Sequence, residues 1–173
     1  ALVLNIVAPG LSRMKIRELA RHVRKISGYE KEPFFPIVHF IELVLGDPDN
    51  PEFNFEIVEP WEMEDMYGTT NTGTNTMKIR SDVYERAVEG VPRDRFTLCH
   101  ELGHYLLHRP EVMSYARGSI PRYKDPEWQA NTFAGELMAP YDIVKDMSVE
   151  QIASACGMSM QAARIQFQEY HKY

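Results

Sequence analysis

The sequence predicts an α+β protein that is mainly helical, with a small three-stranded antiparallel sheet and a C-terminal helix-turn-helix-like segment. Three observations support this fold class. Apolar residues recur at helical spacing over residues 12–27, 93–109 and 127–138. Short β-prone stretches separated by turn-forming residues occupy residues 53–80. Two short apolar helices separated by a glycine are expected after residue 148.

Composition and charge are those of an ordinary globular protein. The chain has 173 residues, of which 44% are hydrophobic and 25% are charged, and its formal net charge is −6. This length fits one domain or a domain with a small appendage. The negative charge argues against a broad basic surface for nucleic acid. Cys99 and Cys156 have no spacing that suggests a disulfide framework, so we expect two reduced thiols packed in the core.

The amino-terminal region gives no sign of a targeting or membrane segment. Residues 1–8 are apolar but lack a basic leading stretch, and no apolar run approaches ~18 residues. We therefore expect a soluble cytoplasmic protein with no membrane partner. Residues 12–27 predict an amphipathic helix capped by Ser12 and ended by Gly28. Its basic outer face is interpreted as a solvated face, the alternative being contact with nucleic acid or an acidic partner. A second short helix is expected over residues 37–45.

Three short strands are expected before the central helix. Residues 53–59 alternate in part between apolar and polar, and residues 66–68 and 76–80 look like two more strands. The connector 69–75 is rich in turn formers and could close a hairpin. Its strands could offer an edge to which an extended peptide adds itself, although an ordinary hairpin tip fits equally well. Residues 82–91 are expected to form a connector.

The central helix lies between two prolines and carries the stretch His100-Glu-Leu-Gly-His104. Two histidines four residues apart project from one side of a helix, so their ring nitrogens can reach one tetrahedral ion at roughly 2.0–2.1 Å. Glu101 lies about 100° further round and can reach a metal-bound water as a catalytic base without being a ligand. Gly103 would let another segment approach the helix backbone closely. Because an unpaired buried carboxylate costs several kcal/mol, a metal site is favoured over two core histidines.

The third metal ligand is expected from the next helix. Asp125 and Pro126 supply an N-cap and a first-position proline for this helix, which extends to residue 138. Glu127 shares a face with small residues, so we predict it as the third ligand and Asn131 as the residue that orients its carboxylate. Three protein ligands leave a position for water, as in catalytic zinc sites. The rival ligands are Glu136, Glu111, Asp125 and His108. Glu136 is expected on a more exposed side of the helix.

Residues 111–124 are expected to be irregular, and their length suits a lid or a substrate wall. Hydrolysis of a peptide bond also needs a hydrogen-bond donor for the developing oxyanion. The candidates for this stabilising role are Tyr105, His108, Tyr115 and Tyr123. The sequence does not choose among them, although Tyr115 and Tyr123 lie in the segment that joins the two helices.

Residues 141–173 are expected to form a helix-turn-helix-like segment packed on a main domain of residues 1–140. Ser148 begins its first helix, Gly157 turns the chain and Ser159 caps its second helix. The segment holds three Lys or Arg residues against four Asp or Glu residues, too little positive charge to neutralise phosphates. Direct DNA binding is therefore not expected, and a structural or protein-docking helix pair is favoured.

The stretch His100-Glu-Leu-Gly-His-Tyr-Leu-Leu-His108, followed by Glu127-x-x-Ala-Asn-x-Phe-Ala-x-x-Leu-Met-x-Pro140, resembles the ImmA/IrrE family of zinc metallopeptidases. The similarity covers roughly residues 12–170, and the chain departs from the usual Leu-Leu-Met-Pro ending only in having Leu-Met-Ala-Pro. The resemblance implies a zincin-like core that binds one zinc ion through His100, His104 and Glu127, with Glu101 as catalytic base. It also implies an intracellular endopeptidase that cleaves a partner helix-turn-helix repressor, often of the Xre type, and so releases a stress-response or mobile-element operon.

Two other functions fit the same residues. One is a non-proteolytic regulator that binds a repressor or DNA. The other is the toxin-like half of a toxin–antitoxin pair, with a neighbouring helix-turn-helix protein as antitoxin. A complete set of ligands and base is hard to explain without hydrolysis, so the peptidase is favoured. The same donor set also suits manganese or iron.

Overall fold

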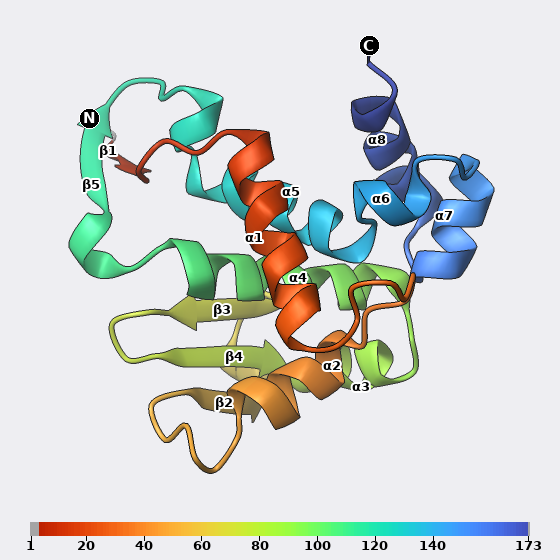
Figure 1. Ribbon diagram of the computed structural model, residues 1–173. Helices are drawn as coiled ribbons and strands as arrows, with labels where there is room; N and C mark the ends of the chain where they lie inside the picture. Colours follow the sequence, from red (N-terminus) through yellow and green to blue (C-terminus); the bar gives the residue numbers. More distant parts are fainter. Residues whose placement is uncertain (1–3, 173) are drawn as a thin grey trace.

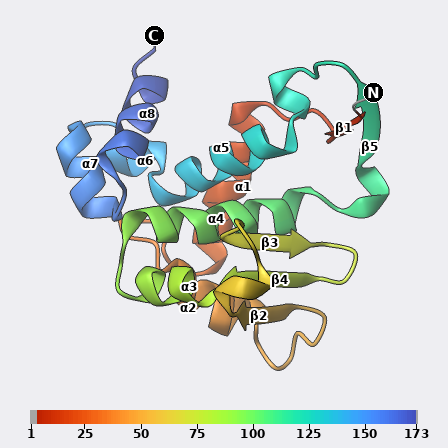
Figure 2. The same ribbon diagram turned by 180° about the vertical axis from the view of Figure 1, so that it is seen from behind.

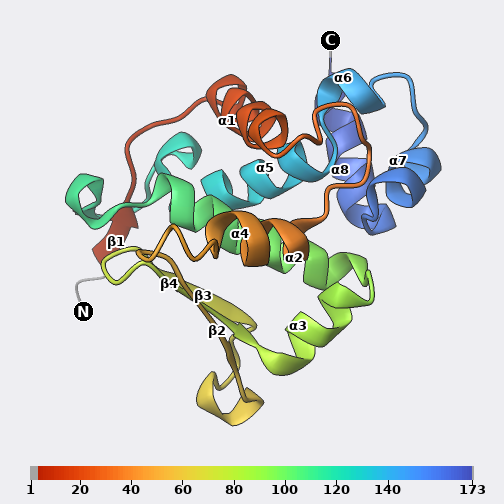
Figure 3. The same ribbon diagram turned by 60° about the horizontal axis from the view of Figure 1, so that its bottom comes forward.

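Helix α4 (Pro92–Leu107) runs through the middle of the protein, with a small sheet on one side and two helices on the other (Figure 1). The computed structural model describes residues 4–172. Helices α1 (Arg13–Ile26) and α5 (Pro126–Met138) form the layer opposite the sheet, and a second view from below agrees (Figure 3). The predicted α+β class is therefore confirmed, and helices dominate the chain.

The three-stranded sheet has the order β2–β4–β3 and is mixed, so the prediction of an all-antiparallel sheet was wrong. Strand β3 (Gly68–Asn71) pairs antiparallel with β4 (Thr76–Arg80) in a hairpin, as expected, but it includes residues 69–71 of the expected connector in place of residues 66 and 67. Strand β2 (Asn54–Val58), in contrast, runs parallel to β4. The segment after β2 crosses to the far edge of the sheet, whereas a short hairpin would have paired β2 with β3. Turn-forming residues in a sequence predict a hairpin, but they do not predict that the preceding strand crosses to the other edge of the sheet.

Capping residues set several helix starts where they were expected. The Ser12 side chain accepts a hydrogen bond from the Lys15 backbone N–H at the start of α1, and Asp125 accepts one from the Glu127 N–H at the start of α5. The remaining helices and helical turns are α2 (Ile37–His39), η1 (a π-helix, Phe40–Leu45), η2 (Pro60–Glu62), α3 (Ser81–Val88), η3 (Pro110–Val112), η4 (Arg122–Lys124), α6 (Tyr141–Val144), α7 (Val149–Cys156) and α8 (Met160–Tyr170). Residues 82–91, expected as a connector, thus belong mostly to helix α3. None of the described helices has the length and apolar character needed to cross a bilayer.

A two-stranded ribbon at the end of the molecule opposite α8 was not predicted. Strand β1 (Leu4–Val7) pairs antiparallel with β5 (Ser114–Arg117), which lies inside the segment expected to be irregular (Figure 1). The paired residues of β1 and β5 are more than a hundred positions apart along the chain, so no local sequence pattern predicts the pairing. The ribbon joins the amino-terminal segment to the connection between α4 and α5.

The C-terminal helices pack at the other end of α4 and α5 (Figure 1). Ser148 caps α7, Gly157 ends it in the left-handed conformation with φ of 64°, and Ser159 caps α8. Cys156 in this segment and Cys99 on α4 are both buried free thiols, as expected. Burial raises the pKa of Cys99 to about 12 and that of Cys156 to about 11, which keeps both protonated and unreactive.

One face of α5 is held by α1 and α8 through buried charged groups. The Arg24 guanidinium is 1% exposed and donates to the carbonyl oxygens of Leu137 at 2.7 Å and Met138 at 3.2 Å. Glu136 is also 1% exposed, so the expectation of a more exposed side was wrong. Its carboxylate accepts from Arg17 Nε at 3.0 Å and from the Tyr170 hydroxyl. Helical geometry placed Glu136 opposite Glu127 correctly, but that face is covered by two other helices.

Helices α4 and α5 approach each other closely at Gly103. A Cβ at this position would lie 3.0 Å from Phe133 Cδ1, 3.2 Å from Ala130 Cα and 3.3 Å from the Ala130 carbonyl oxygen. The backbone atoms of Ala130 cannot rotate away from such a contact. The predicted role of Gly103 in admitting a neighbouring segment is therefore confirmed.

We predict that Gly103→Val destabilises the protein by about 2–3 kcal/mol, because overpacking against backbone forces the two helices apart. Urea denaturation gives the free energy of unfolding for both forms. The control is Ser154→Val on the exposed face of α7, which should change the free energy of unfolding little, because serine and valine have similar helix propensities. Equal losses for the two variants would show that the contact at Gly103 is not tight.

Candidate active site

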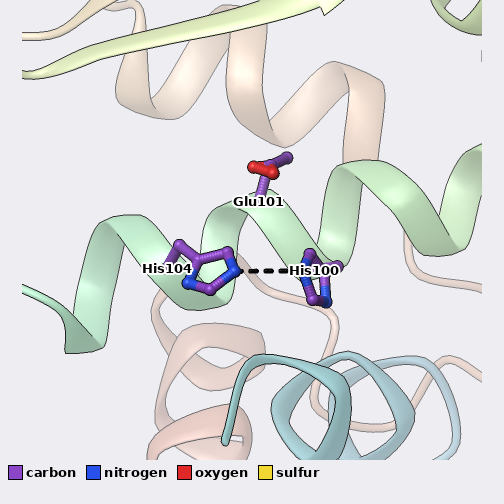
Figure 4. A group of neighbouring side chains, drawn as sticks. All are labelled: His100, Glu101 and His104. Carbon is purple, nitrogen blue, oxygen red and sulfur yellow. Dashed lines mark hydrogen bonds between the residues drawn. The ribbon is translucent and has the colours of Figure 1, made fainter. Parts of the chain in front are cut away.

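His100 and His104 lie side by side on one face of α4, with their Nε2 atoms 3.0 Å apart (Figure 4). Glu101 projects from the adjacent position of the same helix (Figure 4). One nitrogen or oxygen atom from each of these three residues lies within 4.8 Å of the others, so the group could hold a metal ion. The four-residue spacing on one helix accounts for this arrangement.

Glu127 on α5 completes the cluster. Its Oε2 lies 3.1 Å from His100 Nε2, and its Oε1 lies 3.1 Å from His104 Nε2. The contact between Gly103 and Ala130, one helical turn away from Glu127, sets the distance between the two helices here. The neighbouring imidazoles of His100 and His104 hold the pKa of Glu127 well below its usual range, so the carboxylate is ionised. The Glu127 side chain is 66% exposed, which leaves the cluster open to solvent.

A chain of hydrogen bonds leads away from His104 into the protein. His104 Nδ1 lies 2.7 Å from His108 Nδ1, and His108 Nε2 lies 2.9 Å from Gln129 Oε1. The Gln129 Nε2 atom donates to the carbonyl oxygens of Pro9 and Tyr123, both at 2.8 Å. Sequence reasoning missed Gln129, because the two carbonyls that identify it lie in distant irregular segments.

The two carbonyls determine where the protons of this chain lie. Since carbonyls only accept, the Gln129 amide must present its oxygen to His108, whose Nε2–H therefore donates. His108 Nδ1 then carries no proton, and its lone pair accepts a hydrogen bond from the Nδ1–H of His104. The remaining His104 nitrogen, Nε2, carries a lone pair that faces His100 and Glu127. Burial lowers the pKa of His108 to about 4, which keeps this ring neutral at physiological pH.

Asn131 holds the other histidine. Its side-chain oxygen lies 2.7 Å from His100 Nδ1, so the Nδ1–H of His100 donates and its Nε2 is free to accept a cation. Asn131 was predicted to orient the carboxylate of Glu127, whereas its hydrogen bond goes to the histidine. Burial lowers the pKa of His100, but the neighbouring carboxylates of Glu127 and Glu101 and the side-chain oxygen of Asn131 outweigh it and raise this pKa.

Glu101 is held by a strand of the sheet. The Thr70 hydroxyl on β3 donates to Glu101 Oε2 at 3.0 Å, and the Glu101 residue is 6% exposed. This burial raises the pKa of its carboxyl above the usual range. A Cβ on Gly68 would lie 3.2 Å from Glu101 Cγ, so the strand backbone passes directly over the side chain. Thr70 gave no signal in the sequence, because only the fold places β3 there.

Two cavities adjoin the cluster. The smaller, about 430 Å³, is lined by His100, Glu101, His104 and Glu127 together with Tyr67. The larger, about 960 Å³, reaches from His104 and Glu127 to the β1–β5 ribbon and includes Tyr115. Tyr115 is 71% exposed and therefore accessible to a ligand. Tyr67 precedes β3 and was not singled out from the sequence.

The other candidates are placed away from these cavities or have another role. Tyr105 packs edge-on against Phe53 in the core, with ring centres 5.0 Å apart. Tyr123 is half exposed and contributes its backbone oxygen to Gln129. Asp125 caps α5, and Glu111 lies on the exposed turn η3. His108 is engaged by His104 and Gln129, as described above.

His100 Nε2, His104 Nε2 and the Glu127 carboxylate come from two helices and face one another. Neither of the two imidazole nitrogens carries a proton, so no hydrogen bond joins them. Such an arrangement is repulsive by itself and is relieved by a cation at its centre. Two imidazoles and one carboxylate match the donor set that zinc takes in open, catalytic sites. The residues present therefore fit a divalent metal ion.

Comparison with protein families identifies a related family. The model of the M78 peptidases, described as the IrrE N-terminal-like domain, matches residues 62–167. This range contains the strands β3 and β4 and both helices of the cluster, α4 and α5. A search of curated proteins found no significant match.

We predict that His108 in the metal-free protein is a neutral Nε2–H tautomer at pH 7 and stays neutral down to about pH 5, because a histidine is uncharged above its pKa. Long-range ¹H–¹⁵N correlation spectra report the tautomer directly. In Gln129→Leu, which removes the acceptor, the ring should populate both tautomers. A charged His108 at pH 6, or an Nδ1–H form in the unaltered chain, would contradict the proton arrangement.

Proposed function

The chain belongs to the ImmA/IrrE family of peptidases, and on this basis we propose that it is a zinc-dependent endopeptidase. One observation carries the proposal. Two imidazole nitrogens and a carboxylate lie 3.0–3.1 Å from one another, beside a buried glutamate on the same helix. A glutamate held beside the cluster can serve as the general base of metal-assisted hydrolysis, whereas a structural ion pair has no use for it.

His100, His104 and Glu127 would hold the zinc ion. When bound, zinc lowers the pKa of a coordinated water toward ~7 and polarises the scissile carbonyl as a Lewis acid. Asn131 and His108 orient the two imidazoles, so that the ring nitrogens face the ion without a proton to lose. The open side of the cluster leaves room for water and substrate.

Glu101 acts as the general base in this proposal. Its raised pKa brings the carboxyl closer to neutral pH, where it can take a proton from water and later give it to the leaving amine. The Thr70 hydroxyl donates a hydrogen bond to the Glu101 carboxylate, which restricts the side chain to few conformations and so keeps it in place for proton transfer. Tyr67 lines the smaller cavity and Tyr115 the larger one, so their hydroxyls are the proposed donors to the oxyanion.

The proposed substrate is a helix-turn-helix repressor of the Xre type, cleaved in the cytoplasm to release a stress-response or mobile-element operon. The resemblance of the two motifs to the family supports this choice. Two alternatives have distinct signatures. Specific operator binding with a steep salt dependence would indicate a DNA-binding regulator. Growth inhibition that survives loss of the base would indicate a toxin that does not act by proteolysis.

We predict that Glu101→Gln retains one zinc per chain but lowers the rate of cleavage by about 10²–10⁴-fold, because the amide cannot accept the proton. Metal content is measured by atomic emission, and cleavage by incubation with the helix-turn-helix protein encoded nearest to this chain. Cleavage at an undiminished rate would remove Glu101 from the mechanism.

We predict that His100→Ala, His104→Ala and Glu127→Ala each lose zinc after dialysis against a weak chelator, because two remaining ligands bind too weakly. The matched control is Glu111→Ala, which removes an exposed carboxylate outside the cluster and should retain the metal. Full zinc retention by Glu127→Ala would show that the third ligand comes from elsewhere.

A further inference from the structure

A third cavity lies along α8, next to the cluster but outside it. This groove of about 640 Å³ runs between α4, α5 and α8, and we refer to it as the α8 groove. Figure 2 shows α8 standing above the amino-terminal end of α4 and beside α5. Its apolar lining includes Phe96, Trp128, Met158, Ala162 and Ile165. Ile165 is 51% exposed, so an apolar surface faces solvent in the groove.

The α8 groove adjoins the smaller cavity of the cluster. Phe96, Thr97 and Asn131 line both spaces. Asn131 is the residue that holds His100, so a chain lying in the groove passes within one side chain of the proposed metal ion. A polypeptide that extends along the groove toward Asn131 therefore leads to the cluster.

The charge of the α8 groove is opposite to that of the protein. Three arginines, Arg13, Arg93 and Arg122, line it against a single carboxylate, Glu169, although the whole chain carries a net charge of −6. Arg13 is paired with Glu169 at 3.4 Å. Arg93 and Arg122 are exposed, and neither forms a salt bridge with any residue of the described range 4–172. Two guanidinium groups are thus available to a ligand.

The cavity on the other side of the cluster has a different character. Its lining contains Asp125 and Glu127 but no lysine or arginine among the described residues. The path across the cluster is therefore asymmetric, with a lining whose described residues are free of lysine and arginine toward the β1–β5 ribbon and a cationic, apolar end at α8. A substrate with the opposite asymmetry would bind in one direction only.

We propose that the α8 groove binds the substrate polypeptide on one side of the scissile bond and selects a segment that carries acidic side chains beside a large apolar one. This rests on the proposed peptidase function. Burial of the apolar side chain against Trp128 and Ile165 supplies affinity, and Arg93 and Arg122 pair with the carboxylates. The C-terminal helices then act as a wall of the substrate site.

Binding can be measured apart from cleavage. Fluorescence anisotropy is recorded for Glu101→Gln protein with labelled peptides of about twelve residues, roughly 40 Å at ~3.3 Å per residue. One peptide carries Glu, Leu and Phe in one half and Ser, Gly and Ala in the other, and its counterpart has Gln in place of each Glu. We expect about five- to tenfold tighter binding of the acidic peptide at low salt.

The double substitution Arg93→Gln and Arg122→Gln should abolish this preference. The matched control is Arg164→Gln, an exposed arginine on α8 that does not line the groove and should leave the preference intact. Equal affinity for both peptides, absence of binding to either, or a preference that survives the double substitution would overturn the proposal.

Cleavage by the unaltered protein separates this proposal from the peptidase itself. Cleavage of both peptides with equal KM would refute the groove's selectivity and leave the peptidase in place. Selective binding that depends on the two arginines, without cleavage of any peptide, would support the groove and count against the proposed function. In the expected case, the double substitution raises KM for the acidic peptide about five- to tenfold and leaves kcat nearly unchanged.

Discussion

The close approach of α4 to α5 is the constraint on which the cluster depends. The proposed ligands come from two helices, and only the absence of a side chain at Gly103 allows the backbone of Ala130 to approach so near. One turn before Ala130, Glu127 then reaches both histidines at 3.1 Å. The lack of a Cβ at Gly103 thus allows side chains from two helices to form a single group of acceptors. The layers outside this pair, the sheet on one side and α1 with α8 on the other, keep it from opening.

The arrangement of protons in the site is fixed far from the cluster. Backbone carbonyls of Pro9 and Tyr123 orient Gln129, and two histidines pass that orientation on to the lone pair of His104. The same two segments are joined by backbone hydrogen bonds, including Leu11 N–H to the Tyr123 carbonyl at 2.9 Å. The amino-terminal segment, which contributes no ligand, therefore determines the chemical state of one ligand atom.

Much of the site could be predicted from the sequence because its signals are local. The spacing of His100 and His104, the base between them and the capped helix that begins with Asp125 each occupy a few consecutive residues, and the structure brings their side chains together. Thr70, Tyr67 and Gln129 escaped notice, since their roles follow from a strand crossover and distant carbonyls. The burial of Glu136 and the β1–β5 ribbon were missed for the same reason, because both arise from segments more than a hundred residues apart.

Arg24 carries its charge into the interior without any carboxylate partner. Burial lowers its pKa to about 10, so it stays charged at neutral pH, and its donors are distributed over carbonyls from the loop that follows α1 and from the end of α5. A lysine would present three donors at one point instead of five in a plane, and could not serve acceptors on two sides. Arginine therefore suits this position better than lysine. Because its partners are uncharged backbone carbonyls, the contribution of these hydrogen bonds to stability should depend little on ionic strength.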